Sequence, residues 1–118
     1  MSEDHSFEIG FYEALDKRNP TDGRVMEILA QLYTRVGRNE DGLSMDLRLS
    51  KVRPEDPLVH YNLACSLALV GQLEEAVNTL RNSIRMGYRD FEWMMKDPDL
   101  DTIRELPSYT KLIDEIDA

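Results

Sequence analysis

The feature that most constrains the fold of this chain is a pattern at positions 26–37 that recurs at positions 60–71. The pattern Met26-x-x-Leu29-Ala30-x-x-Tyr33-x-x-x-Gly37 returns as His60-x-x-Leu63-Ala64-x-x-Leu67-x-x-x-Gly71. The same shift along the chain places Pro20 on Pro54. A fixed period of about 34 residues is typical of repeat proteins, in which each unit stacks on its neighbour to bury a shared core. Such proteins mostly bind other proteins, so the repeat indicates a class of function without naming a partner.

Helical periodicity covers most of the chain. Apolar residues at helical spacing predict an N-terminal helix that ends at Asn19-Pro20, with one face made of Phe7, Phe11, Tyr12 and Leu15. Further helices are predicted over 25–36, 43–52, 58–70 and 73–86, the last with Ala76, Val77, Leu80 and Ile84 turned inward. Gly37, Gly71 and Gly87 are suited to end three of these helices, and Asp56 before Pro57 is suited to begin one. No stretch alternates as a strand does, so we predict an all-α chain of antiparallel helix pairs.

The chain resembles the tetratricopeptide repeat family at these positions. Residues 57–90 carry apolar or small side chains where that family expects them, namely Leu63, Ala64, Leu67, Gly71, Ala76, Leu80 and Ser83. Residues 23–56 fit in their first helix, but Gly42 and Asp46 depart from the pattern in the second. The resemblance implies a right-handed α-solenoid with capping helices, formed by one domain over residues 1–118. Its parts would be a half-repeat helix at 3–20, repeats at 23–56 and 57–90, and a terminal helix and cap at 91–118.

The C-terminal segment is similar to the closing segment of bacterial arrays of this family. A stack of repeats exposes an apolar end, so a cap with a polar outer face is expected. Asp97 and Ser108 are predicted helix N-caps within it. The predicted core of the cap consists of Tyr88, Phe91, Trp93, Met94 and Met95.

The resemblance also implies a peptide-binding groove lined by the first helix of each pair. The implied groove residues are Arg24, Glu27, Ile28, Gln31, Thr34, Arg35, Leu58, Tyr61, Asn62, Cys65, Ala68, Leu69, Glu92 and Lys96. The alternative for these positions is a solvated surface without a ligand. Some family members clamp the C-terminal carboxylate of a chaperone, and Asn62 and Lys96 occupy comparable places. Glu27 and Gln31 disfavour that clamp, because a carboxylate would meet a like charge at Glu27.

Charge and cysteine content exclude several classes of partner. The net charge is −9, and both ends of the chain are acidic while residues 23–96 are neutral. We therefore expect no nucleic acid as a partner. No apolar run approaches the roughly 20 residues that span a bilayer, so we expect no membrane partner. The single cysteine, Cys65, cannot form an internal disulfide, and the N-terminus lacks the pattern of a secretory signal. A cytoplasmic location is the expectation.

Catalytic patterns are absent from the sequence. His5 and His60 have no partners in a nucleophilic arrangement, and His60 and Cys65 are five positions apart, a poor spacing for one helix face. Asp97, Asp99 and Asp101 begin like a calcium loop, but glycine at its sixth position and glutamate at its twelfth are missing. We expect no enzyme activity, no cofactor and no metal.

The sequence therefore predicts a non-catalytic adaptor or scaffold that binds a peptide or protein segment in its groove. The alternative is a self-associating structural module that forms a homo-oligomer through its terminal helices. Packing of Phe7, Phe11 and Tyr12 against the rest of the chain would favour the binder, and an open apolar face there would favour self-association.

Overall fold

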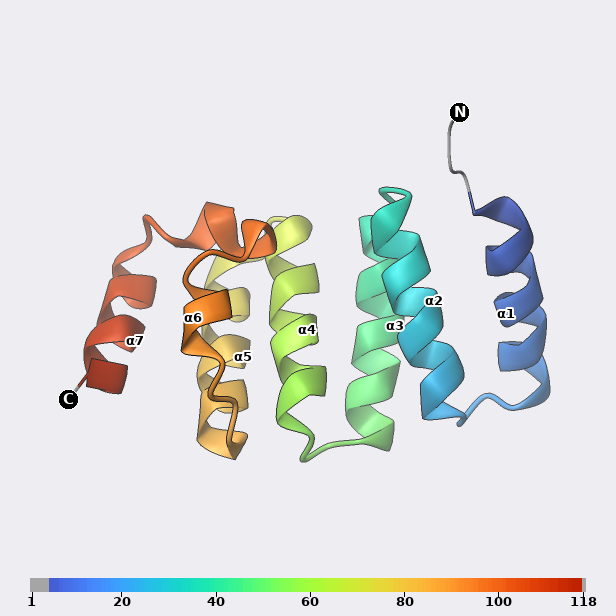
Figure 1. The fold of residues 1–118 in the computed structure, drawn as a ribbon, viewed down its shortest axis with the longest axis horizontal. Helices are drawn as coiled ribbons and strands as arrows, with labels where there is room; N and C mark the ends of the chain where they lie inside the picture. Colours follow the sequence, from blue (N-terminus) through green and yellow to red (C-terminus); the bar gives the residue numbers. More distant parts are fainter. Residues whose placement is uncertain (1–4, 118) are drawn as a thin grey trace. The chain divides into compact units, whose positions relative to one another are not determined.

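Helices contain most of residues 5–117, the part of the chain that the computed structural model describes (Figure 1). In chain order they are α1 (Ser6–Arg18), α2 (Gly23–Arg35), α3 (Asn39–Val52), α4 (Pro57–Leu69), α5 (Leu73–Met86), α6 (Phe91–Met94), the 3-10 helix η1 (Pro98–Ile103) and α7 (Pro107–Asp117). Within residues 5–117 there is no β-strand, and no helix is long and apolar enough to cross a membrane. The predicted all-α class is confirmed. The chain separates into two compact units, unit 1 (Met1–Pro54) and unit 2 (Glu55–Ala118).

The period of the sequence is also the period of the helices. α2 and α4 each have 13 residues, and α3 and α5 each have 14. The shift that superimposes the two sequence patterns also places the start of α2 on the start of α4, and the start of α3 on that of α5. The N-caps repeat as well, because the carboxylates of Asp22 and Asp56 accept hydrogen bonds from the backbone N–H groups of Arg24 and Leu58, both at 3.0 Å. Each unit is therefore built on the same helix-turn-helix hairpin, as expected of a helical repeat fold.

The turn inside each hairpin depends on one glycine. Gly37 has φ +84° and Gly71 has φ +87°, in the left-handed region that favours glycine. The N–H of Arg38 donates to the C=O of Tyr33 at 2.7 Å, and the equivalent bond in the second hairpin is 2.9 Å. A bond from the residue after the glycine back to the last turn of the helix defines the Schellman ending. The predicted helix ends at these two glycines are confirmed.

The apolar core of unit 1 joins α1 to the α2–α3 hairpin. Its buried members are Ile9, Val25, Leu29, Leu32 and Tyr33, with Tyr12, Leu15, Val36 and Met45 packed against them. The predicted apolar face of α1 is thus divided: Tyr12 and Leu15 pack inward, whereas Phe7 and Phe11 are 84% and 53% exposed. The inward face of α1 follows Ile9 instead, which lies on the side of the helix away from Phe7.

Polar contacts also hold α1 to the hairpin. The hydroxyl of Tyr33 donates to Glu13 at 2.5 Å. The guanidinium of Arg48 donates to both carboxylate oxygens of Asp16 at 2.9 Å, and to the C=O of Pro20 at 3.0 Å. A two-pronged arginine–carboxylate contact fixes orientation as well as distance. α1 is therefore held in one register against α2 and α3.

The departure from the repeat pattern at Gly42 has a steric cause. Gly42 is buried in α3, and a Cβ atom placed there would lie 2.9 Å from Oγ1 of Thr34. That hydroxyl donates to the C=O of Ala30 at 2.9 Å, which fixes its position. Thr34 on α2 therefore occupies the space that a larger residue at position 42 would need.

Small residues line the crossing of α4 and α5 in unit 2. Ala64 on α4 and Ala76 on α5 are fully buried, and so are Val77 and Leu80. The predicted inward positions Ala76, Val77 and Leu80 are confirmed. The hydroxyl of Ser83 donates to the C=O of Pro57 at 2.7 Å, which ties the end of α5 to the start of α4.

The C-terminal segment contains one predicted cap and lacks the other. Asp97 accepts a hydrogen bond from the N–H of Asp99 at 3.0 Å and so caps η1, as predicted. The prediction for Ser108 was wrong. α7 begins at Pro107, whose fixed φ suits the first helical position, so Ser108 lies inside the first turn. Its buried hydroxyl has no hydrogen-bond partner among the described residues.

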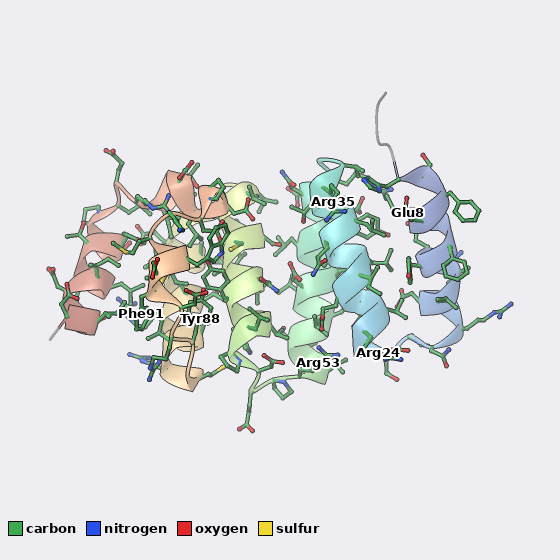
Figure 2. All side chains as sticks on the ribbon, viewed as in Figure 1. Glu8, Arg24, Arg35, Arg53, Tyr88 and Phe91 are labelled. Atoms are coloured by element: carbon green, nitrogen blue, oxygen red, sulfur yellow. The ribbon has the colours of Figure 1, made fainter. Side chains whose placement is uncertain are left out.

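The five residues predicted as the core of this segment divide into two groups. Tyr88 and Met94 are buried and Phe91 is half-buried, whereas Trp93 and Met95 are exposed. Figure 2 shows Tyr88 and Phe91 where the chain enters α6. α6 has only 4 residues, so it is too short to bury a full apolar face.

Candidate functional site

The outward face of α2 carries four exposed side chains at helical spacing. They are Arg24, Ile28, Gln31 and Arg35, here called the α2 stripe. Spacings of four, three and four positions keep them on one side of the helix. Figure 2 shows Arg24 and Arg35 toward opposite ends of α2. The stripe therefore presents one apolar side chain and one amide between two guanidinium groups.

The carboxylate of Glu27, the predicted site residue beside this stripe, is paired within unit 1. Arg53, at the C-terminal end of α3, forms a salt bridge with it. Gly23 leaves the room for this contact, since a Cβ there would lie 2.9 Å from the Arg53 guanidinium. Sequence reasoning missed Arg53, because it lies 26 residues from Glu27 and no local pattern joins them. The pairing offsets the like charge that an incoming carboxylate would meet at Glu27.

The rigid setting of α2 gives the stripe a fixed geometry. The opposite face of the helix is buried through Leu29, Leu32 and Tyr33. The guanidinium of Arg38 lies over the Tyr33 ring, 4.5 Å from its centroid, and Tyr33 donates to Glu13. Burial, followed by that hydrogen bond, raises the pKa of Tyr33, so its hydroxyl stays a donor. Guanidinium groups on such a scaffold suit carboxylates, and an amide can donate to and accept from a peptide backbone.

The predicted site residues of unit 2 differ widely in exposure. Leu58 is 57% exposed and Lys96 is exposed, while Asn62 and Leu69 are half-buried. Tyr61 and Cys65 are buried, only 3% and 6% exposed, and Ala68 is buried as well. The side chains of Tyr61 and Cys65 are therefore closed to a peptide, although the resemblance implied that they line a groove.

Tyr61 is buried because η1 packs on α4 and Tyr88 covers its ring. The rings of Tyr61 and Tyr88 are stacked, with centroids 4.3 Å apart and planes 9° from parallel. The Tyr61 hydroxyl donates to Oδ2 of Asp97 at 2.6 Å. Burial and then this hydrogen bond raise the pKa of Tyr61. The Asp97 contact spans 36 residues of sequence, so no helix period could have predicted it.

Three buried or half-buried side chains near this contact have the elements of a metal site. One ligand atom each of Cys65, Asp97 and Asp99 lies within 4.8 Å of the others. Both oxygens of Asp97 are already used, one by the Asp99 N–H and the other by Tyr61 and by the Cys65 thiol at 3.7 Å. Burial, and then the nearby Asp97, raise the pKa of Cys65, so the thiol keeps the proton that it donates to Asp97. The cluster is therefore assigned to holding η1 on α4.

Sequence comparison relates this chain to a longer protein. No family model matches the chain. Over 88 residues, or 72% of this chain, it is 30% identical to a chloroplastic protein of Arabidopsis thaliana. That match covers 26% of the relative, so the chain spans about a quarter of the length of the curated protein it matches.

Proposed function

We propose that this chain is a non-catalytic adaptor of the tetratricopeptide type that binds a peptide segment of another protein. The observation that carries the proposal is the α2 stripe, in which Ile28 and Gln31 lie exposed between Arg24 and Arg35 on a helix fixed by its buried face. The recurring helical hairpin supports the family assignment. Leu58 and Asn62 on α4 of unit 2 stay predictions of the family resemblance and form no part of the α2 stripe.

The chemistry of the stripe selects an acidic peptide with an apolar centre. The eleven residue-to-residue steps from Arg24 to Arg35 cover roughly 16 Å along a helix. An extended peptide covers that length in about five residues at roughly 3.3 Å each. The proposed ligand therefore has two acidic side chains four or six positions apart, which places both on the same side of an extended peptide, with an apolar side chain between them for Ile28. The salt bridge between Glu27 and Arg53 offsets the repulsion that the Glu27 carboxylate would exert on this acidic peptide.

A peptide selection tests this proposal directly. A displayed library of random peptides is selected on the immobilised protein, and an enriched peptide is then titrated by fluorescence anisotropy. Enrichment of spaced acidic residues is expected, with at least tenfold weaker binding by Ile28→Ser and by Arg24→Ala/Arg35→Ala. Leu47→Ser is the matched control, because Leu47 is also an exposed aliphatic residue on unit 1, at 43%. Equal binding by all variants would contradict the proposal.

The compartment is also a proposal. The buried free thiol of Cys65 is compatible with a reducing location such as the cytoplasm. The name of the Arabidopsis relative places that protein in the chloroplast, which makes the chloroplast the alternative for this chain. A fluorescent fusion imaged in the source cell decides between them.

A further inference from the structure

The outward face of α1 is apolar and uncovered in unit 1. Phe7 and Phe11 are 84% and 53% exposed. With Ala14 and Arg18, also exposed, they form a stripe at spacings of four, three and four positions, here called the α1 stripe. Two exposed phenylalanines one turn apart are costly in water unless another surface covers them. The stripe has the heptad spacing by which helices pair along a seam.

Two acidic residues of α1, Glu13 and Asp16, are already paired with side chains of the α2–α3 hairpin. Glu13 accepts from Tyr33 and lies 3.9 Å from Arg38. Asp16 accepts hydrogen bonds from the two terminal nitrogens of the Arg48 guanidinium. The charges beside the stripe that have no partner on α2 or α3 are Glu8 near the start of α1, whose carboxylate lies 3.2 Å from Nδ1 of His5, and Lys17 and Arg18 at its end. An acidic beginning and a basic end are complementary to the same helix running in the opposite direction.

We propose that the α1 stripe is the contact surface for a second copy of this chain, with the two α1 helices packed antiparallel. In that register Phe11 faces Ala14 of the second copy, and Phe7 faces Arg18. Arg18 of each copy then lies beside Glu8 of the other, so the two ends of the interface carry opposite charges.

The backbone of α1 permits the close approach that this packing needs. Gly10 borders the stripe, and a Cβ placed there would meet nothing within 4 Å. It also lines a shallow pocket of about 390 Å³ with Ser6, Ile9, Glu13, Val36 and Arg38. Antiparallel packing brings Lys17 of the second copy near Gly10, where the missing side chain leaves room for its stem.

The size of the surface sets the expected strength. One face of a 13-residue helix buries well below the roughly 800 Å² per partner of a stable interface. The dimer is therefore expected to be weak and to form with rising concentration. This inference is independent of the α2 stripe, which lies on a different helix and binds a different class of ligand.

Sedimentation velocity over a concentration series tests the interface on the full chain. A reversible monomer–dimer equilibrium is expected, and Phe7→Ser and Phe11→Ser are each expected to weaken it about tenfold or more. Leu47→Ser and Ile28→Ser, which remove exposed aliphatic groups from other helices, are expected to leave it unchanged. Circular dichroism checks that each variant is folded. A wild type that stays monomeric at all concentrations, or that grows beyond dimers, would overturn the proposal.

Charge reversal tests the orientation. Glu8→Arg and Arg18→Glu are each expected to weaken the dimer, because each places like charges side by side in the antiparallel register. The double variant Glu8→Arg/Arg18→Glu is expected to restore the wild-type dissociation constant. A double variant as weak as the single ones would exclude the antiparallel register.

Discussion

The hydroxyl of Tyr61 on α4 donates a hydrogen bond to the carboxylate of Asp97, 2.6 Å away at the start of η1. Asp97 uses its other oxygen to cap η1 through the N–H of Asp99. Arg104 completes the connection, since its guanidinium donates to the C=O groups of Met94 and Asp97 at 3.0 and 2.8 Å. A single buried carboxylate thus joins the C-terminal segment to the helical hairpin of unit 2.

Loss of this carboxylate is expected to destabilise unit 2. Asp97→Ala removes a helix cap worth about 1 kcal/mol and leaves the Tyr61 hydroxyl buried without its acceptor, at a cost of about 1–3 kcal/mol. Tyr61→Phe is expected to cost about 1 kcal/mol. Urea denaturation of the single and double variants measures both effects, with Asp114→Ala as an exposed control. Strictly additive losses in the double variant would show that the two side chains do not interact.

The pKa of Asp99 predicts a pH dependence of stability. Burial, and then the carboxylates of Asp97 and Asp101, raise this pKa above its ordinary value of 3.8. The folded state therefore binds the proton more tightly, so this group favours folding below pH 3.8 and loses that contribution as pH rises through the folded pKa. The free energy of unfolding of Asp99→Asn, measured relative to that of the wild type, is expected to be larger at pH 7 than at pH 3. Urea denaturation at both values checks this, and an equal difference at both would contradict it.

The contact between Gly42 and Thr34 predicts a stability gain that appears only in a double variant. Alanine is favoured over glycine inside a helix by about 1 kcal/mol, but a Cβ at position 42 would lie 2.9 Å from Oγ1 of Thr34. Gly42→Ala alone is therefore expected to give no gain. In a Thr34→Ala background the same change is expected to stabilise by about 1 kcal/mol. Thermal denaturation of the four proteins measures this, and a gain in the wild-type background would contradict the steric explanation.

The buried thiol of Cys65 is expected to resist modification. It is 6% exposed, and burial followed by nearby Asp97 raises its pKa, so little thiolate is available. Reaction with an aromatic disulfide reagent at pH 8 is expected to be slow in the folded protein and fast in urea. Tyr61→Ala, which opens a space beside the thiol, should speed the reaction in the folded state. Fast labelling of the folded wild type would show that η1 does not cover this side chain.

Local patterns allowed much of the fold to be predicted. The hairpins follow from helical periodicity, the caps at Asp56 and Asp97 from short polar side chains before proline, and the turns at Gly37 and Gly71 from the left-handed conformation that glycine tolerates. Ser108 was misassigned because Pro107 beside it decides where α7 begins.

The candidate site could be predicted only in part. The exposure of the α2 stripe could be predicted, since the spacing of the apolar residues on one helix face leaves the other face outside; the role of these residues in binding stays a prediction. The burial of Tyr61 and Cys65 could not be predicted, because it depends on η1. That helix comes after α5 and α6 in the chain, and no local sequence pattern connects it with α4. The division of the α1 face was missed for the same reason: Ile9 packs on α2, which leaves Phe7 outside.

The most direct test of the central claim is a nuclear magnetic resonance titration. The ¹⁵N-labelled protein is titrated with an acidic peptide enriched on it, and the backbone amide shifts are followed residue by residue. We expect the largest shifts along α2, around Ile28 and Gln31, and we expect them to be absent in Arg24→Ala/Arg35→Ala. Shifts confined to other helices, with α2 unchanged at saturation, would contradict the assignment of the α2 stripe as the binding site.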